Sequence, residues 1–282
     1  MDAARQRAVL GRIAELVERE YFDPDVALWL AASVRELPPA EGATEQGLAE
    51  RVTALLRPHE AHFGVYAGDW APRERRTVDR SGPAIEAGVD GGIGVLTVRV
   101  FDDGDDHDAV AVAQQALAAV AGCDALVLDL CDVPGGYPSM VELLLGAFVA
   151  EPAHVLTFHA RDERFESWTR PGASDPRLTG LPLLVAVDGG TASAAESCAY
   201  ALQSLGRATV VGAPTVGAAN PGLPHDTGLG FTVFISNGSP VDPRTGRNWE
   251  RTGVVPDVAA DLPLEAAIAL ARKAATGVGR EA

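Results

Sequence analysis

Lysine, cysteine and aromatic residues are scarce in this chain of 282 residues. Its one lysine, Lys273, lies in the last predicted helix, which leaves no lysine elsewhere to act as a catalytic base. The three cysteines, Cys123, Cys131 and Cys198, form an odd set without metal-ligand spacing, and all lie in apolar segments. We therefore expect reduced, buried thiols in a cytoplasmic protein, and we expect neither a metal nor another cofactor.

Long apolar runs and basic charge are also lacking. No stretch reaches the 18 apolar residues of a transmembrane helix, and residues 1–20 lack the apolar core and cleavage site of a secretory signal. The formal net charge is -16, so the chain should repel nucleic acid and anionic membranes, and neither is an expected partner. Hydrophobic residues make up 47% of the chain, enough for a full core.

Apolar periodicity and proline breaks predict three helices within residues 1–60. Beyond them, strands are predicted at 63–66, 92–100, 125–130, 154–158, 183–187, 208–211 and 231–235. Helices are predicted at 109–121, 140–149 and 264–275, with another between Ser193 and Gly206. This pattern predicts an α/β fold class, with a helical domain over residues 1–60 and an α/β domain over residues 61–282. Residues 67–90 are polar and rich in arginine. Residues 162–177, 212–224 and 238–246 are expected to be loops or turns.

The acidic segment DDGDDHD at residues 102–108 has two interpretations. Carboxylates suit calcium or magnesium, but the spacing does not follow an EF-hand. We therefore favour a solvated turn that caps the next helix.

The stretch from Leu183 to Gly212 is the most informative. An apolar strand is followed by Gly189-Gly190 and then by Ser193, where a helix begins. Free backbone N–H groups and the helix dipole favour negative charge there, which suits a nucleophilic serine and its oxyanion. The alternative is that Ser193 or Thr191 only caps the helix.

Three motifs resemble those of the tail-specific, or C-terminal-processing, serine peptidases of family S41. The first combines TASAAE at 191–196, GRA at 206–208 and VGAPTVG at 211–217; the second is Pro134-Gly135-Gly136 after the strand ALVLDL; the third is ERTGVVPD at 250–257. Relatives include the tricorn core and the interphotoreceptor retinoid-binding modules. The resemblance covers nearly the whole chain, and it implies the ββα spiral superfold shared with Clp-type peptidases and crotonases, after a small helical domain.

The resemblance also implies roles for individual residues. Ser193 matches the nucleophile of the family. One of Gly135 and Gly136 would supply one donor of the oxyanion hole, and the amide of Ala194 would supply the other.

A base is implied by the same comparison. His62 matches the family histidine at the start of the catalytic domain, with His59 as the nearby competitor. Glu250 matches the glutamate of the tricorn-like set and would orient the histidine. The family lysine would fall at Ala218, so a Ser-Lys mechanism is not expected; Ala61 replaces the serine that bridges histidine and glutamate in the tricorn branch.

The expected function is therefore a serine peptidase that acts on a peptide or small acyl substrate. Two alternatives are a non-proteolytic retinoid- or lipid-type binding protein and a biosynthetic acyl-transfer hydrolase on the same scaffold. Residues 67–90 are too few for a PDZ module, which puts recognition of substrate C-termini in question. A homo-oligomer is compatible with the sequence.

Overall fold

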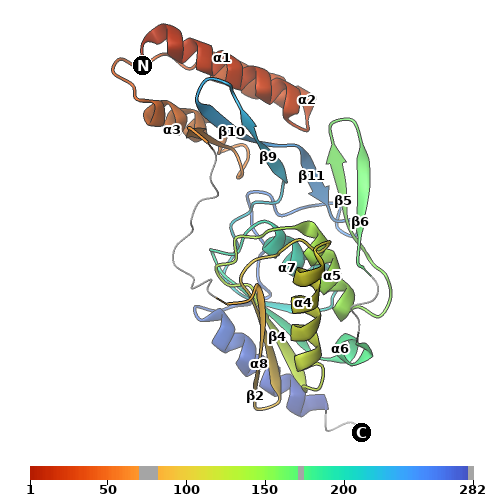
Figure 1. The fold of residues 1–282 in the computed structure, drawn as a ribbon. Helices are drawn as coiled ribbons and strands as arrows, with labels where there is room; N and C mark the ends of the chain where they lie inside the picture. Colours follow the sequence, from red (N-terminus) through yellow and green to blue (C-terminus); the bar gives the residue numbers. More distant parts are fainter. Residues whose placement is uncertain (70–81, 171–174, 279–282) are drawn as a thin grey trace. The chain divides into compact units, whose positions relative to one another are not determined.

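The computed structural model describes residues 1–69, 82–170 and 175–278 (Figure 1). The chain forms two compact units, and each is assembled from separate stretches of sequence. The first unit comprises Met1–Glu74, Phe158–Phe165 and Asn220–Pro240. The second comprises Arg75–Thr157, Glu166–Ala219 and Val241–Ala282.

The first unit combines three helices with an antiparallel sheet. The helices are α1 (Ala3–Glu20), α2 (Pro24–Glu36) and α3 (Glu45–Leu56), as predicted, and each has a side-chain N-cap. The sheet has the order β1-β10-β9, with β1 (Gly64–Ala67), β10 (Phe231–Ser236) and β9 (Gly222–Asp226). Apolar residues of the helices, β1 and β10 share one buried cluster. This cluster gives the first unit a core of its own.

Strand β1 lies at the edge of this sheet, beside α3. The Thr53 hydroxyl of α3 accepts a hydrogen bond from the Val65 N–H at 2.8 Å and lies 3.3 Å from the Val65 carbonyl, to which it donates. A helix side chain therefore satisfies both backbone groups of Val65 that do not pair with β10.

The second unit is built on a six-stranded sheet with the order β12-β8-β7-β4-β3-β2. All its neighbouring strands are parallel except the antiparallel pair β2 and β3. The bounds are β2 Ile85–Asp90, β3 Ile93–Val98, β4 Ala125–Asp129, β7 Leu183–Val187, β8 Thr209–Gly212 and β12 Val258–Ala259. The middle strands β4 and β7 are almost wholly buried, as parallel strands covered on both faces should be.

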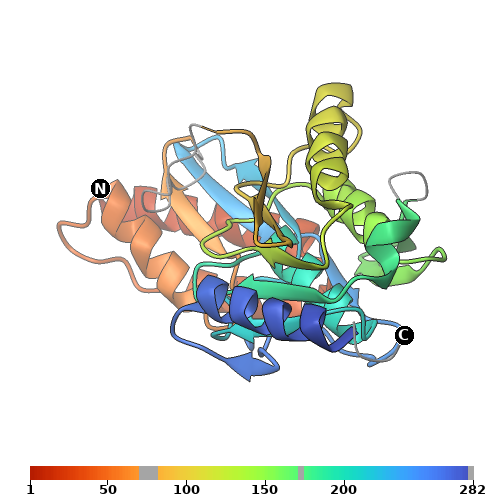
Figure 2. The ribbon, with the colours of Figure 1, turned by 90° about the horizontal axis from the view of Figure 1, so that it is seen from below.

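Helices cover both faces of this sheet. They are α4 (His107–Val120), α5 (Pro138–Phe148), α6 (Pro176–Gly180), α7 (Ala194–Ser204) and α8 (Pro263–Val278). Alternate residues of the strands, such as Ala125 and Val127, form a buried cluster with Ala267 and Ala271 of α8. Figures 1 and 2 show α8 on one side of the sheet and α4 and α5 on the other. The predicted α/β class is confirmed.

The acidic turn before α4 is a helix cap, as favoured from the sequence. The Asp106 side chain accepts hydrogen bonds from the amides of Asp108 and Ala109, both at 2.9 Å. Asp103 accepts a hydrogen bond from the Ser139 hydroxyl at 3.0 Å, and Asp105 forms an ion pair with Arg170. These carboxylates therefore have partners within the protein.

Three segments predicted as loops or turns contain strand residues: 162–177, 212–224 and 238–246. Segment 162–177 includes β6 (Arg164–Trp168), which joins β5 (His154–Ala160) and β11 (Gly238–Val241) in the sheet β11-β5-β6. Stacked ring pairs join β5 to β6: Phe158 with Phe165, and His154 with Trp168. Segment 238–246 includes all of β11, and segment 212–224 includes the first residues of β9. Segment 67–90, for which no element was predicted, includes β2. Residues 70–81 and 171–174, within segments 67–90 and 162–177, lie outside the described residues.

In the described part of the chain, every helix is too short or too polar to cross a membrane.

Candidate active site

Ser193 has an unusual backbone conformation at the point where β7 leads into α7. It occupies the N-cap position with φ 55° and ψ -121°, whereas an ordinary N-cap has extended dihedral angles. For a residue with a Cβ, this backbone conformation is unfavourable by on the order of 1–3 kcal/mol, and it persists only where surrounding contacts hold it. A strained serine between a strand and a helix is the arrangement that exposes a nucleophile for acyl transfer.

Gly135 lies directly against Ser193. A Cβ built on Gly135 would stand 2.7 Å from the Ser193 Cβ and 2.9 Å from the Ala194 nitrogen. Gly135 and Gly136 have φ values of 109° and 139°, which favour glycine. Within the described residues, the amides of Gly135, Gly136 and Ala194 have no hydrogen-bonded acceptor. These amides are therefore available to a developing oxyanion.

Asp188 joins the two loops that form this region. One of its carboxylate oxygens accepts hydrogen bonds from the amides of Asp132 at 2.9 Å, Gly190 at 2.9 Å and Thr191 at 3.1 Å. The Thr191 hydroxyl donates to the Leu130 carbonyl at 2.8 Å. The turn that carries Gly135 and the elbow that carries Ser193 are thus held together by a side chain that the sequence analysis did not single out.

Glu196 is the second residue that the sequence analysis missed. Its side chain is buried and accepts hydrogen bonds from the amides of Ser193 at 2.8 Å, Gly217 at 2.6 Å and Ala218 at 2.9 Å, and from the Thr215 hydroxyl at 2.5 Å. Burial raises the pKa of Glu196, while these four donors oppose the rise. A signal was present, because a glutamate three residues after an N-cap serine is a capping-box pattern.

Glu250 is connected to Ser193 through the same loop. Its carboxylate accepts a hydrogen bond from the Ala219 amide at 2.8 Å, and the Arg251 amide donates to the Gly217 carbonyl at 2.7 Å. Loop 215–219 therefore contacts the Ser193 elbow through Glu196 and the Glu250 segment directly. The structure brings Ser193, Gly135, Ala194 and Glu250 into one framework within the second unit.

Both histidine candidates lie in the first unit. The His62 ring is half-buried, with its centroid 5.9 Å from that of Phe234. The His59 ring makes an edge contact with Trp29 at 4.6 Å. The choice of base thus stays a prediction from the motif.

Ala218 stands at the position of the family lysine. Its side chain is buried and its amide is bonded to Glu196. The one lysine, Lys273, belongs to α8. Alanine cannot serve as a base, so a serine-lysine pair stays unexpected at this position.

The site thus combines a strained serine elbow with adjacent backbone amides on an α/β scaffold. The model of the family described as Peptidase family S41 matches residues 92–260, more than half of the chain. The chain belongs to peptidase family S41.

Similar proteins agree with this assignment. The chain is 31% identical over 145 residues to a carboxyl-terminal-processing protease of Synechocystis sp., covering 51% of this chain and 32% of that protein. It is 37% identical over 116 residues to one of Picosynechococcus sp., covering 40% and 27%. The chain therefore spans about a third of the length of these relatives.

Solved structures share the fold. The photosystem II D1 C-terminal processing protease matches with a TM-score of 0.60 and 15% identity over 91% of this chain and 93% of that one. A lipoprotein from Streptococcus agalactiae matches with a TM-score of 0.63 and 17% identity, covering 95% and 96%.

Proposed function

We propose that this protein is a serine peptidase that hydrolyses peptide bonds with Ser193 as its nucleophile. The observation that carries the proposal is the strained Ser193 elbow packed against the Gly135 backbone, in a chain of family S41. Relatives named as carboxyl-terminal-processing proteases support the peptide class of substrate.

The proposed chemistry follows a serine triad. His62 takes the hydroxyl proton of Ser193 as the oxygen attacks the substrate carbonyl, and the amides of Ala194 and of Gly135 or Gly136 stabilise the oxyanion. His62 then donates the proton to the leaving amine, which departs and leaves the acyl group on Ser193. In the second half, His62 takes a proton from the attacking water and returns it to the Ser193 oxygen as the acyl group is released. Glu250 stabilises the imidazolium.

The nucleophile is tested by labelling the protein with a fluorophosphonate and by digesting a peptide library. Wild type should be labelled and should cleave peptides, and Ser193→Ala should lose the label and about 10⁴ or more in rate. Ser197→Ala, in the same helix one turn later, is the matched control and should keep both. Wild-type turnover in Ser193→Ala would contradict the assignment, and labelling without any peptide cleavage would favour the acyl-transfer alternative.

The same assay separates the two histidines. His62→Ala should lose turnover to a similar extent, whereas His59→Ala should retain it. The reverse result would keep the mechanism and move the base to His59.

A further inference from the structure

A closed turn precedes Glu250 in the second unit. At residues 242–247, the Asp242 amide donates to the Arg247 carbonyl at 2.9 Å, and the Gly246 amide donates to the Asp242 carbonyl at 2.8 Å. The Asp242 side chain is completely buried and accepts a hydrogen bond from the Arg244 amide at 2.7 Å. The turn is therefore ordered by its own hydrogen bonds.

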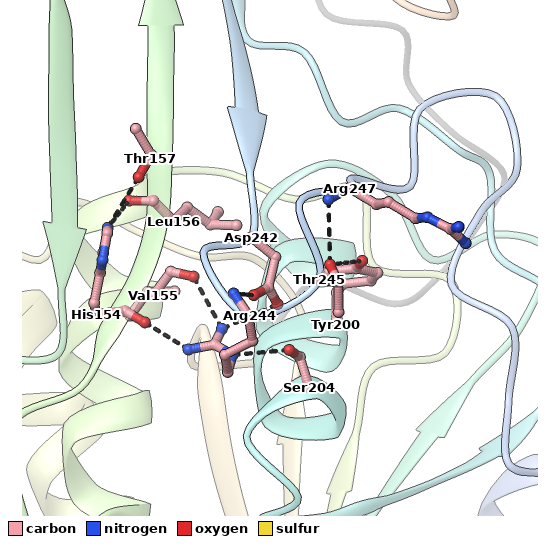
Figure 3. Close-up of polar contacts among 10 residues, drawn as sticks. All are labelled: His154, Val155, Leu156, Thr157, Tyr200, Ser204, Asp242, Arg244, Thr245 and Arg247. Atoms are coloured by element: carbon pink, nitrogen blue, oxygen red, sulfur yellow. Dashed lines mark hydrogen bonds and ion pairs between the residues drawn. The ribbon is translucent and has the colours of Figure 1, made fainter.

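Arg244 fastens this turn to two other elements (Figure 3). Its guanidinium donates to the carbonyls of His154 at 2.6 Å and Val155 at 3.1 Å, at the beginning of β5. It also donates to the Ser204 hydroxyl at 2.8 Å and to the Asp242 carboxylate at 3.0 Å. Four acceptors from three parts of the chain thus converge on one planar cation, a geometry that arginine provides and lysine does not.

The turn also lies along α7. The hydroxyls of Tyr200 and Thr245 are 3.2 Å apart, and the Tyr200 ring contacts the buried ring of Trp249 at 4.9 Å. Tyr200 and Ser204 are four residues apart, so they share one face of the helix. One face near the C-terminal end of α7 therefore holds the segment that leads into Glu250.

We infer that Arg244 is a positioning residue for the peptidase proposed above, and the inference rests on that function. Helix α7 begins beside Ser193 and ends at Ser204, so it is one rigid element with the nucleophile at one end and the Arg244 contacts at the other. Arg244 holds the Glu250 segment to that helix. The 215–219 loop holds it near Ser193, and the two attachments together fix Glu250 relative to the nucleophile.

The first test is Arg244→Lys, which keeps the charge beside buried Asp242 but cannot reach all four acceptors. We expect kcat on a cleaved peptide to fall about 10- to 100-fold with little change in KM, because a shift of Glu250 by about 1 Å from its place beside the nucleophile would have this effect. Arg247→Lys is the matched control. Its side chain points away from the cluster in Figure 3, and its kcat should equal that of wild type.

A double-mutant cycle with Glu250→Gln shows whether Arg244 acts through Glu250. If it does, Arg244→Lys should lower kcat no further in the Glu250→Gln background. Equal effects in both backgrounds, or a wild-type kcat in folded Arg244→Lys, would overturn the inference while leaving the peptidase intact.

Ser204→Ala provides an independent variant if Arg244→Lys does not fold. It removes one acceptor on α7 and leaves the pair with Asp242, so kcat should fall in the same direction; an unchanged kcat would also overturn the inference. A wild type that cleaves no peptide would instead refute the proposed function and this role with it.

Discussion

Within the described residues, positive φ values outside glycine occur at Asp132, Ser193 and Arg251. All three lie in loops of the candidate active site, and each has a backbone hydrogen bond that holds it. The Asp132 amide donates to Asp188, the Ser193 amide to Glu196 and the Arg251 amide to the Gly217 carbonyl. Because each conformation is unfavourable by about 1–3 kcal/mol, these hydrogen bonds are needed to hold the three residues in place.

Gly135 permits a sensitive test of this packing. Gly135→Ala would bring a methyl group within 2.7 Å of the Ser193 Cβ at a φ that alanine resists, so fluorophosphonate labelling of Ser193 should slow at least about tenfold. Gly189→Ala is the matched control, because a Cβ at that position would meet no atom within 4 Å. Labelling rates that are equal in the two variants would argue against Gly135 as part of the site.

The sequence was informative about single residues where a motif names them. Ser193, Gly135, Gly136, Ala194 and Glu250 could all be placed in one region by resemblance. For Glu196 the sequence offered only the capping-box pattern with Ser193. Its further donors, such as the Ala218 amide, are distant in sequence, and so is the Asp132 amide that donates to Asp188. Which amides donate to a buried carboxylate depends on how the chain folds, so the number of donors cannot be read from the sequence.

Helix α7 links the site to the core. Its first turn carries the elbow contacts, and Cys198 in its middle is wholly buried. Burial raises the pKa of Cys198 to about 12. The helix can therefore hold the nucleophile because its opposite face is anchored in apolar surroundings.

The shifted thiol predicts both a reactivity and a pH dependence. Cys198 should not react with a maleimide at pH 8 in the native protein, because thiolate is the reactive form. Since its pKa is raised by folding, its contribution to stability is complete below the unfolded value of 9.0 and declines as pH rises toward about 12. Mass spectrometry of labelled peptides checks the first point, and unfolding midpoints of wild type and Cys198→Ala check the second. Rapid native labelling of Cys198 would show that the helix opens.

Elements with strong apolar periodicity were predictable, and polar strands were not. β7 and β4 are short, almost wholly apolar runs bounded by turn residues, as fully buried strands should be. β6 has the polar sequence RFESW, and its Phe165 and Trp168 rings stack on Phe158 and His154 of its partner β5. Pairing of this kind depends on register, which composition does not contain.

The two units show why domain limits are hard to read from a sequence. β1 pairs with β10, so that Gly64 lies opposite Phe234. The first unit thus takes in segments far along the chain, such as Asn220–Pro240. The turn residues at the ends of that segment predict a change of direction, but they do not show which unit the segment joins. The sequence-based boundary at residue 60 stays a prediction.

Net charge makes a prediction for the whole molecule. With a formal charge of -16, the protein should attract cationic peptides and repel anionic ones. For matched substrates that differ only in distal lysine or glutamate residues, kcat/KM should favour the cationic peptide at about 0.01 M ionic strength. The preference should shrink toward about 1 M as screening shortens to about 3 Å. A salt-independent ratio would show that distal charge has no influence.

The contact between the Thr53 hydroxyl of α3 and Val65 of β1 has a consequence for how copies of this protein behave together. An open sheet edge is a template on which another chain can add a strand, and polymerisation can begin there. At Val65 that template is already occupied, and the occupant belongs to the same molecule. A second chain would have to displace the Thr53 hydroxyl before it could pair with Val65, so this contact opposes strand addition at that position.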